Sequence, residues 1–395
     1  MPWNQTNADK ERLSLISDHL TGNYGVTELA LSYGVSRKSV YKWLERYRMD
    51  GLGGLHERSR APRHQPRAIA SEIVEAILLL KQQWPRWGAP KLLARLKKQL
   101  SPHRTPSEST VSEILKRHGL SFTQRTKRRK ATPSAQPFGQ LKGPNDVWCI
   151  DFKGWFNTGN GQKCNPLTLS DAYSRYLLRC QGLGERTGSL LVKPILMSAF
   201  REYGLPMAIR SDNGPPFAST GLAGLTPLNV WWIRLGIGLQ RIEPGNPQQN
   251  GRHERLHRTL KEYVCNPVAW TLASQQRKME YFRQEYNEQR PHEALKQKTP
   301  SECYESSTRE YPEKVPALRE YPQDWLVRKI WSHGQMKWKG QNIHISRALG
   351  ELPIGLQPIG DGLWAIWFEQ FELGVFDERK LKVKGHRKWM PHGEA

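Results

Sequence analysis

The sequence has 395 residues, of which 60 are Lys or Arg and 37 are Asp or Glu, so its formal net charge is +23 and its isoelectric point is about 9.9. At roughly 100–200 residues per domain, this length predicts two to four domains and excludes a small disulfide-stapled scaffold. The charge is far above what solubility requires and indicates a polyanionic partner. The net positive charge decreases along the chain, from +14 on residues 1–140 to +8 on 141–300 and +1 on 301–395.

The five cysteines are odd in number and contain no C-x-x-C pair, which argues against a disulfide framework or a cysteine zinc site. This composition favours a reducing compartment. The first residues, MPWNQTNADKERL, lack the apolar segment of a signal peptide, and no stretch has the 18 or more apolar residues of a membrane span. We therefore expect a soluble intracellular protein that does not associate with a membrane.

Residues 8–48 carry apolar side chains at helical spacing with an interruption at Gly34. Gly34 can adopt the positive φ of a tight turn, and Ser36 can cap the helix that follows. The pattern predicts a helix-turn-helix DNA-binding domain over residues 1–60. The second helix would present the candidate DNA-binding residues Arg37, Lys38, Ser39 and Lys42. An ordinary helical hairpin with a solvated basic face is the alternative.

A stretch rich in Gly, Pro and Arg follows over 50–68 and is typical of a linker. Periodic segments over 69–82, 89–100 and 107–118 then predict three helices. We interpret residues 61–130 as a second helical DNA-binding module, with a helical spacer as the alternative. The basic run Lys127, Arg128, Arg129 and Lys130 lies on a polar tether, where it would add phosphate contacts.

After residue 145 the pattern changes to apolar strands alternating with a helix. Strands are predicted over 147–152, 167–169 and 172–180, and a helix over 190–203. This alternation indicates an α/β core, which we place at residues 140–305.

A charged, proline-containing linker over 306–322 precedes short β-type segments at 326–331, 343–345, 363–368 and 373–376. They predict a small β-barrel or sandwich over 323–380. Because this region is almost neutral and rich in tryptophan, we expect it to serve assembly or target positioning more than DNA affinity. The alternative is that Trp331, Trp338, Trp364 and Trp367 fill its hydrophobic core.

Three acidic residues of the α/β region are candidates for chemistry. Asp151 lies inside an apolar strand, where an unpaired carboxylate is costly to bury, and Asp212 follows a strand and precedes Asn213-Gly214. Glu254 lies in the first turns of a helix that runs to about Val264. Together they would form an all-oxygen site for two Mg²⁺ or Mn²⁺ ions, which can activate an attacking oxygen and stabilise a leaving one. Singly, Asp212 is also typical of a turn and Glu254 of a helix N-terminus.

Several motifs in order resemble one family. They are Trp148-Cys149-Ile150-Asp151-Phe152, Asp171-Ala172-Tyr173-Ser174-Arg175-Tyr176, Ser211-Asp212-Asn213-Gly214, Gln249-Asn250-Gly251-Arg252-His253-Glu254 and Tyr286-Asn287-Glu288-Gln289-Arg290-Pro291-His292. The segment resembles the catalytic core of bacterial insertion-sequence transposases and retroviral integrases, a ribonuclease H-like fold with an Asp-Asp-Glu triad. The 41 residues between Asp212 and Glu254 exceed the family's usual interval, and the glycine-rich stretch 218–228 accounts for the excess.

The resemblance implies a DDE transposase that binds the ends of its element, cleaves 3′ strands and joins them to target DNA by metal-dependent transesterification. Asp151, Asp212 and Glu254 would hold the metal ions, and Lys261, two helical turns after Glu254, would contact a phosphate. The partners would be double-stranded DNA and further copies of the chain. The location would be the bacterial cytoplasm, in association with the nucleoid.

Two other functions compete. His253-Glu254-Arg255-Leu256-His257 satisfies the H-E-x-x-H pattern of zinc metalloproteases. The surrounding arginines and the lack of a following H-x-x-G-x-x-H extension argue against a zinc protease. A catalytically inactive, transposase-derived DNA-binding regulator would require the loss of at least one carboxylate, and all three are present.

Overall fold

The computed structural model describes residues 8–58, 69–101, 105–121, 140–242 and 251–385. The chain divides into two compact units, one up to residue 70 and one from residue 71 onward. Lys127, Arg128, Arg129 and Lys130 lie outside the described residues. Within the described ranges, each helix is too short or too polar to cross a membrane.

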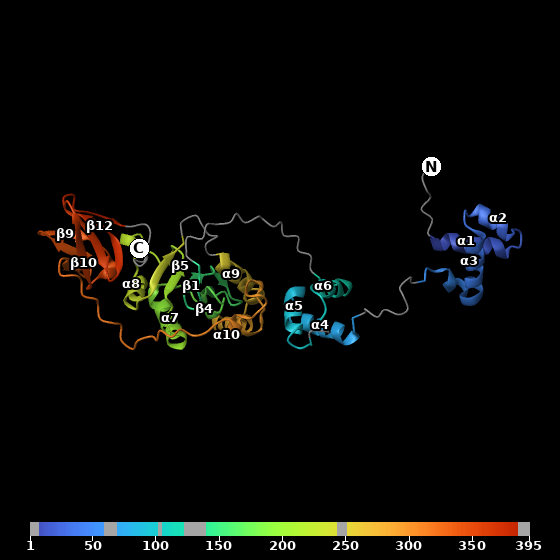
Figure 1. The fold of residues 1–395 in the computed structure, drawn as a ribbon, viewed down its shortest axis with the longest axis horizontal. Helices are drawn as coiled ribbons and strands as arrows, with labels where there is room; N and C mark the ends of the chain where they lie inside the picture. Colours follow the sequence, from blue (N-terminus) through green and yellow to red (C-terminus); the bar gives the residue numbers. More distant parts are fainter. Residues whose placement is uncertain (1–7, 59–68, 102–104, 122–139, 243–250, 386–395) are drawn as a thin grey trace. The chain divides into compact units, whose positions relative to one another are not determined.

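The first unit consists of α1 (Ala8–Leu20), α2 (Val26–Ser32), α3 (Arg37–Asp50) and the 3₁₀ turn η1 (Gly51–Leu55), the blue helices of Figure 1. Gly34 has a φ of +64°, and the side chain of Ser36 accepts a hydrogen bond from the backbone N–H of Ser39 at 3.2 Å. Ala30 and Val40 are buried in the common core of the three helices. The predicted turn, cap and helix packing are therefore confirmed.

The second unit begins with three helices, α4 (Ser71–Gln83), α5 (Ala89–Leu96) and α6 (Glu108–Arg117). The predicted helix over 89–100 thus ends earlier, at Leu96. This helical module contacts the α/β region that follows it. The indole N–H of Trp87 donates to the hydroxyl of Tyr263 at 3.1 Å, and Lys98 pairs with Glu302 at 2.9 Å.

A mixed sheet forms the centre of the α/β region. Its main strands are β1 (Val147–Phe152), β3 (Lys163–Asp171), β4 (Leu177–Leu183), β5 (Ala208–Ser211) and β6 (Gly238–Arg241), and the short β2 (Phe156–Asn157) pairs with the start of β3. The order across the sheet is β4-β3-β1-β5-β6. Pairs within β4-β3-β1 are antiparallel, and those within β1-β5-β6 are parallel. This is a ribonuclease H-like arrangement.

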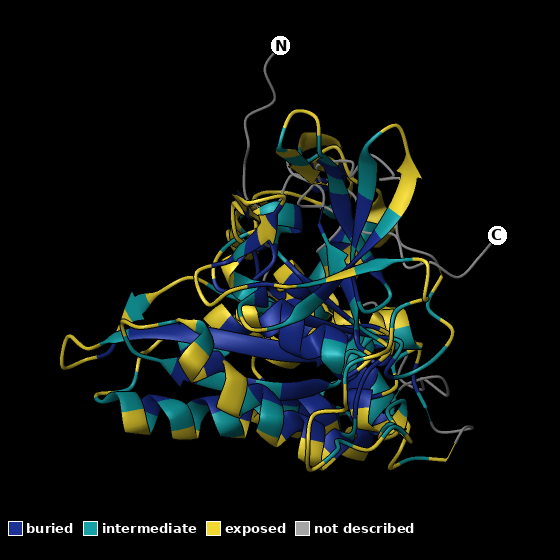
Figure 2. Ribbon diagram, turned by 90° about the vertical axis from the view of Figure 1, so that its left-hand side faces the viewer, coloured by how far each residue is buried: buried dark blue, intermediate teal, exposed yellow. Residues whose placement is uncertain are grey.

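Helices cover both faces of this sheet. On one face, α7 (Ser189–Tyr203) and α8 (Pro227–Arg234) pack against strand residues such as Leu167 and Leu169. On the other face lie α9 (Gly251–Val264) and α10 (Leu272–Gln284), whose apolar residues pack with Leu177 and Cys180. Figure 2 shows the resulting concentration of buried residues along the central strands. Because side chains alternate across a strand, Thr168 and Ser170 face α9.

The strand predicted over 172–180 is wrong in its first half, where the structure has a turn. The carboxylate of Asp171 accepts hydrogen bonds from the backbone N–H and the hydroxyl of Ser174, both at 2.7 Å, and Arg175 has a φ of +66°. Local side-chain bonds of this kind compete with strand pairing. The glycine-rich stretch 218–228 also differs from a plain loop, because it contains the 3₁₀ turn η3 (Leu222–Gly224) and the start of α8.

The carboxyl-terminal region is all-β, as predicted. A five-stranded antiparallel sheet has the order β13-β12-β11-β10-β7, and β8 pairs with β9 as a hairpin. The strands are β7 (Leu326–Lys329), β8 (Gln335–Trp338), β9 (Gln341–His344), β10 (Pro353–Gly360), β11 (Leu363–Phe368), β12 (Phe371–Asp377) and β13 (Lys382–Gly385). The ring of Trp338 lies 5.2 Å from those of both Trp364 and Phe376, centroid to centroid, which favours a core role for these tryptophans. Trp331 is 38% exposed.

This β region shares one continuous hydrophobic core with the mixed sheet. The strands β12 and β13 contact η3, which belongs to the stretch 218–228. The predicted linker 306–322 is also fastened to the α/β region. The guanidinium of Arg309 donates to the carbonyls of Pro206 at 2.5 Å and Gly236 at 2.9 Å.

Candidate active site

Asp151 lies on β1, and Asp212 directly follows the neighbouring parallel strand β5. The register between β1 and β5 pairs Val147 with Ala208 and Cys149 with Arg210. If this register is extended by two residues, Asp151 in β1 comes opposite Asp212, the residue after the end of β5. Adjacent strands are about 4.8 Å apart and alternate residues share a face, so both carboxylates emerge on one side at the carboxyl ends of the two strands.

Asp212 is in a setting that favours a cation. Its Oδ1 atom is buried, and no described residue donates a hydrogen bond to it. Burial raises the pKa of the Asp212 carboxyl above its ordinary value, although the backbone N–H of Gly214 opposes the shift. A bound dication would compensate the desolvated oxygen. The carboxylates of Asp151 and Asp212 therefore fit the oxygen-ligand preference of Mg²⁺ or Mn²⁺.

Glu254 lies in the first turn of α9, as predicted, and its side chain is exposed. Its neighbour His253 is buried instead, at 2% exposure. Among the described residues, one group of three potential ligands has all its ligand atoms within 4.8 Å of one another, and it is Asp151, His253 and His257. Asp151 therefore has its potential ligand atom within 4.8 Å of those of the two histidines. The carboxylates of Asp151, Asp212 and Glu254 do not form such a group.

The two histidines anchor α9 on the sheet through one hydroxyl. Thr168, which is paired with Asp151 across β1 and β3, has its Oγ1 2.6 Å from Nε2 of His253 and 2.8 Å from Nε2 of His257. Burial lowers the pKa of His253 well below its ordinary value, and burial together with Lys153 lowers that of His257 to about 4. Both imidazoles are therefore neutral near pH 7, and the Thr168 hydroxyl can donate to one and accept from the other.

Thr168 and Ser170 are site residues that the sequence analysis missed. The signal was the alternation Leu167-Thr168-Leu169-Ser170, in which every second residue of a buried strand is polar. Such alternation indicates a face with polar partners. Their partner, His253, is 83 residues away from Ser170 along the chain and became evident only in the folded structure.

Thr168→Val is expected to lower the free energy of unfolding by about 1–3 kcal/mol, because an isosteric methyl leaves the nitrogens of the buried His253 and the half-buried His257 without their hydroxyl partner. The measurement is the urea midpoint of the full chain. Thr308→Val, at an exposed position, is the matched control and should change little. Equal midpoints for the two variants would show that the hydroxyl does not anchor α9.

Several basic side chains belong to the strands and the helix that carry the candidate carboxylates. Arg252 donates to the carbonyl of Ala172 at 3.0 Å, and the buried Arg210 donates to the side-chain oxygen of Gln240. Lys261 is exposed on α9, two turns after Glu254, where the sequence analysis expected a phosphate contact. These side chains make the approach to the carboxylates attractive to a polyanion.

In the first unit, Arg37, Lys38 and Lys42 are exposed at the start of α3. Ser39 is half-buried, and its hydroxyl lies 3.0 Å from that of Ser36. Three of the four predicted contact residues are thus presented to solvent, whereas Ser39 also takes part in the helix cap.

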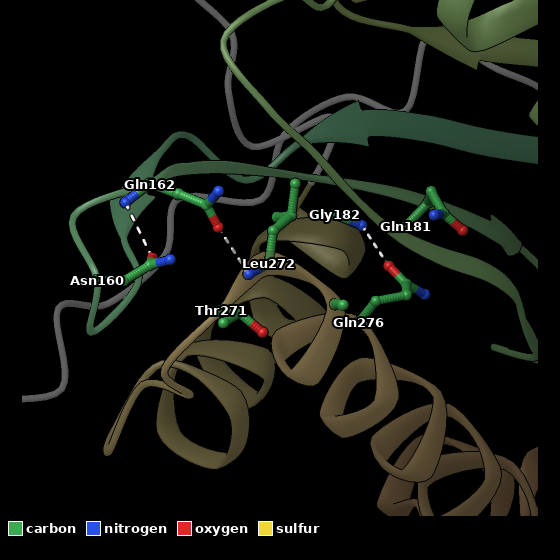
Figure 3. Close-up of a pocket in the computed structure, with 8 residues that line it drawn as sticks. Asn160, Gln162, Gln181, Gly182, Thr271, Leu272 and Gln276 are labelled. Carbon is green, nitrogen blue, oxygen red and sulfur yellow. Dashed lines mark hydrogen bonds between the residues drawn. The ribbon is translucent and has the colours of Figure 1, made fainter.

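A separate open hollow of about 600 Å³ lies between the β3–β4 edge and the start of α10. Figure 3 shows Gln276 reaching the backbone N–H of Gly182 and Gln162 reaching that of Leu272. The side-chain oxygens of Gln276 and Gln162 are therefore already used within the fold. None of the candidate catalytic residues lines this hollow.

Protein-family models match most of the chain. Integrase core domain models match residues 142–247 and 235–300, a helix-turn-helix domain matches 11–63, and a homeodomain-like domain matches 39–115. Residues 142–300 thus match integrase core domains, and the helices before them match helix-turn-helix and homeodomain-like domains. The carboxyl-terminal strands are similar to a more specific group, because residues 326–384 match the C-terminal domain of IS481 family transposases. The predicted resemblance to insertion-sequence transposases is thereby confirmed.

Curated relatives include proteins of bacterial insertion elements. The chain is 29% identical over 242 residues to an uncharacterized protein of insertion element IS407 from Burkholderia multivorans, covering 61% of this chain and 82% of that protein. It is 26% identical to an uncharacterized protein of IS476 from Xanthomonas euvesicatoria, covering 58% of this chain and 64% of that protein. Among solved structures, the magnesium complex of the HTLV-2 integrase catalytic core domain is 16% identical, with a TM-score of 0.32, and covers 42% of this chain and 100% of that chain.

Proposed function

We propose that this protein is a DDE transposase that binds the ends of its element, cleaves the 3′ strands and joins them to target DNA. The observation that carries the proposal is the pair Asp151 and Asp212 at adjacent carboxyl ends of parallel strands, with a buried Asp212 oxygen that no described residue satisfies. Glu254, at the start of the helix that packs on the same face, is the third carboxylate of the proposed site.

The reaction has two steps. In the first, a water oxygen attacks a phosphodiester and releases a 3′-hydroxyl at the element end. In the second, that hydroxyl attacks a target phosphodiester, a new P–O bond forms, and the target 3′-oxygen leaves. Divalent cations, when bound, supply charge neutralisation and acidify the attacking oxygen.

The chain's own residues would hold and orient the reactants. Asp151, Asp212 and Glu254 would bind the cations, and Lys261 and Arg255, both exposed on α9, would position backbone phosphates. The helices α1–α3 would select the element end through Arg37, Lys38 and Lys42. Because two DNA ends must meet, at least two copies of the chain would act together.

The metalloprotease alternative is not favoured by the geometry of His253 and His257. Both Nε2 atoms point at Thr168 beneath α9, and His253 is 2% exposed. A catalytic zinc site keeps an open position for its substrate. Here, the imidazole of His253 lies beneath α9 and is closed to a polypeptide substrate.

The proposal is tested by incubating the purified full chain with a duplex of the element end and a supercoiled target plasmid. With Mg²⁺ or Mn²⁺, we expect covalent joining of the element 3′ end to the target, and with EDTA we expect none. Specific binding without cleavage or joining in either metal would instead support the inactive DNA-binding regulator.

A further inference from the structure

Asp151, His253 and His257 come from one strand and one helix. The two histidines are one turn apart on the same face of α9, with ring centroids 4.7 Å apart. Asp151 lies on β1 opposite Thr168, the residue to which both Nε2 atoms point. The potential ligand atoms of the three side chains lie within 4.8 Å of one another.

This donor set differs in kind from that of the proposed magnesium site. Two imidazole nitrogens and one carboxylate oxygen are ligands that zinc and other borderline transition-metal dications prefer, whereas Mg²⁺ prefers oxygen throughout. Ligand bonds of about 2.0–2.2 Å would require the three groups to draw somewhat closer than they are now. Asp151 and His257 are half-buried, so an ion can enter from their side.

We propose that Asp151, His253 and His257 form a binding site for a zinc-class transition-metal dication that shares Asp151 with the magnesium site. The ion would take the place of Thr168 Oγ1 as the partner of the two Nε2 atoms. Since one carboxylate serves both sites, zinc-class ions and the magnesium-dependent reaction compete for it. That last consequence rests on the proposed function, whereas the binding site does not.

Cobalt(II) is the direct probe, because its visible absorption reports coordination by nitrogen and oxygen ligands. Titration of the full chain is expected to give a saturable band with one equivalent of Co²⁺, which Zn²⁺ abolishes by displacement. His257→Gln should weaken Co²⁺ binding at least tenfold, and Asp151→Asn should do the same. His344→Gln, at an exposed position on β9, is the matched control and should leave the band unchanged.

His253 is buried, so its replacement risks misfolding, and the half-buried His257 is therefore the primary variant, with circular dichroism to verify its fold. Absence of a saturable band in the unaltered chain would overturn the site. So would a Co²⁺ affinity of either variant, His257→Gln or Asp151→Asn, equal to that of the unaltered chain. Inhibition provides a separate measurement. In the joining assay, we expect Zn²⁺ to inhibit the Mg²⁺-dependent activity of each protein. The Zn²⁺ concentration that halves this activity should be at least tenfold higher for His257→Gln than for the unaltered chain. Equal concentrations would show that zinc-class ions do not compete with the magnesium-dependent reaction at this site.

The two proposals fail in different ways. If the unaltered chain joins no DNA, the proposed function fails, and the cobalt titration still decides the metal site. If joining proceeds and no cobalt band forms, the zinc-class site fails and the transposase proposal stands.

Discussion

Asp151→Asn, Asp212→Asn and Glu254→Gln are each expected to reduce strand cleavage and joining about a thousandfold or more while element-end binding persists. Each substitution keeps the shape of the side chain and removes the charge that holds a cation. Metal ions supply several kcal/mol of transition-state stabilisation, and each 1.36 kcal/mol corresponds to a factor of ten in rate. The measurement is the rate of joining, with a gel-shift titration on the same preparations.

Asp361→Asn is the matched control for these variants, because the Asp361 side chain is 94% exposed in the carboxyl-terminal β region. It should join DNA at the unaltered rate. His253→Ala and His257→Ala are expected to have smaller effects than the carboxylate changes, since the histidines anchor α9 and are not ligands of the magnesium site. Joining at the unaltered rate by the chain with Asp212→Asn would contradict the assignment of that carboxylate.

Arg37→Ala is expected to reduce the preference for element ends over random DNA about 10–100-fold, since a good side-chain contact to a base contributes roughly 1–3 kcal/mol of discrimination. Arg37 is exposed at the first position of α3, where a recognition helix meets base edges. Competition gel shifts at several salt concentrations measure the effect. Arg48→Ala, on an exposed position near the end of the same helix, should leave the preference intact.

Substitution of Lys127 or Arg128, on the tether, is instead expected to weaken binding to all sequences alike and to reduce its salt dependence. A chain with Arg37→Ala that kept its full preference for element ends would show that α3 does not select the sequence.

Local patterns in the sequence were sufficient for much of the fold. Gly34 and Ser36 predicted the turn and cap before α3, and the apolar run around Asp151 predicted β1. In each case the deciding interaction is between residues close in sequence, or is a periodicity that one element imposes on its own side chains. The prediction that Asp151, Asp212 and Glu254 form the catalytic site stays a prediction.

Of the parts that the sequence did not reveal, one depends on a local side-chain contact and another on contacts between distant residues. The turn at Asp171 to Arg175 replaced a predicted strand because Ser174, three residues after the end of β3, satisfied the buried carboxylate of Asp171. The pairing of Thr168 with His253 and His257 joins β3 to α9 across about 85 residues. A search for apolar periodicity does not identify the particular polar partner that will lie opposite.

The carboxyl-terminal region is a further case in which contacts between distant residues were not predicted. Its strands were predicted in part, yet its shared core with the mixed sheet was not, because η3 and β13 are about 160 residues apart in sequence. Deletion of residues 323–395 would therefore expose buried apolar surface and destabilise the α/β region. Its expected role in assembly is better tested by substitution of exposed Trp331 than by truncation.

Manganese anomalous diffraction from crystals of the full chain bound to an element-end duplex tests the central claim most directly, because it locates the cations without reliance on a rate. The account predicts anomalous peaks coordinated by Asp151 and Asp212, with a carboxylate oxygen of Glu254 completing the ligand set. Manganese that contacted neither Asp212 nor Glu254 would contradict it.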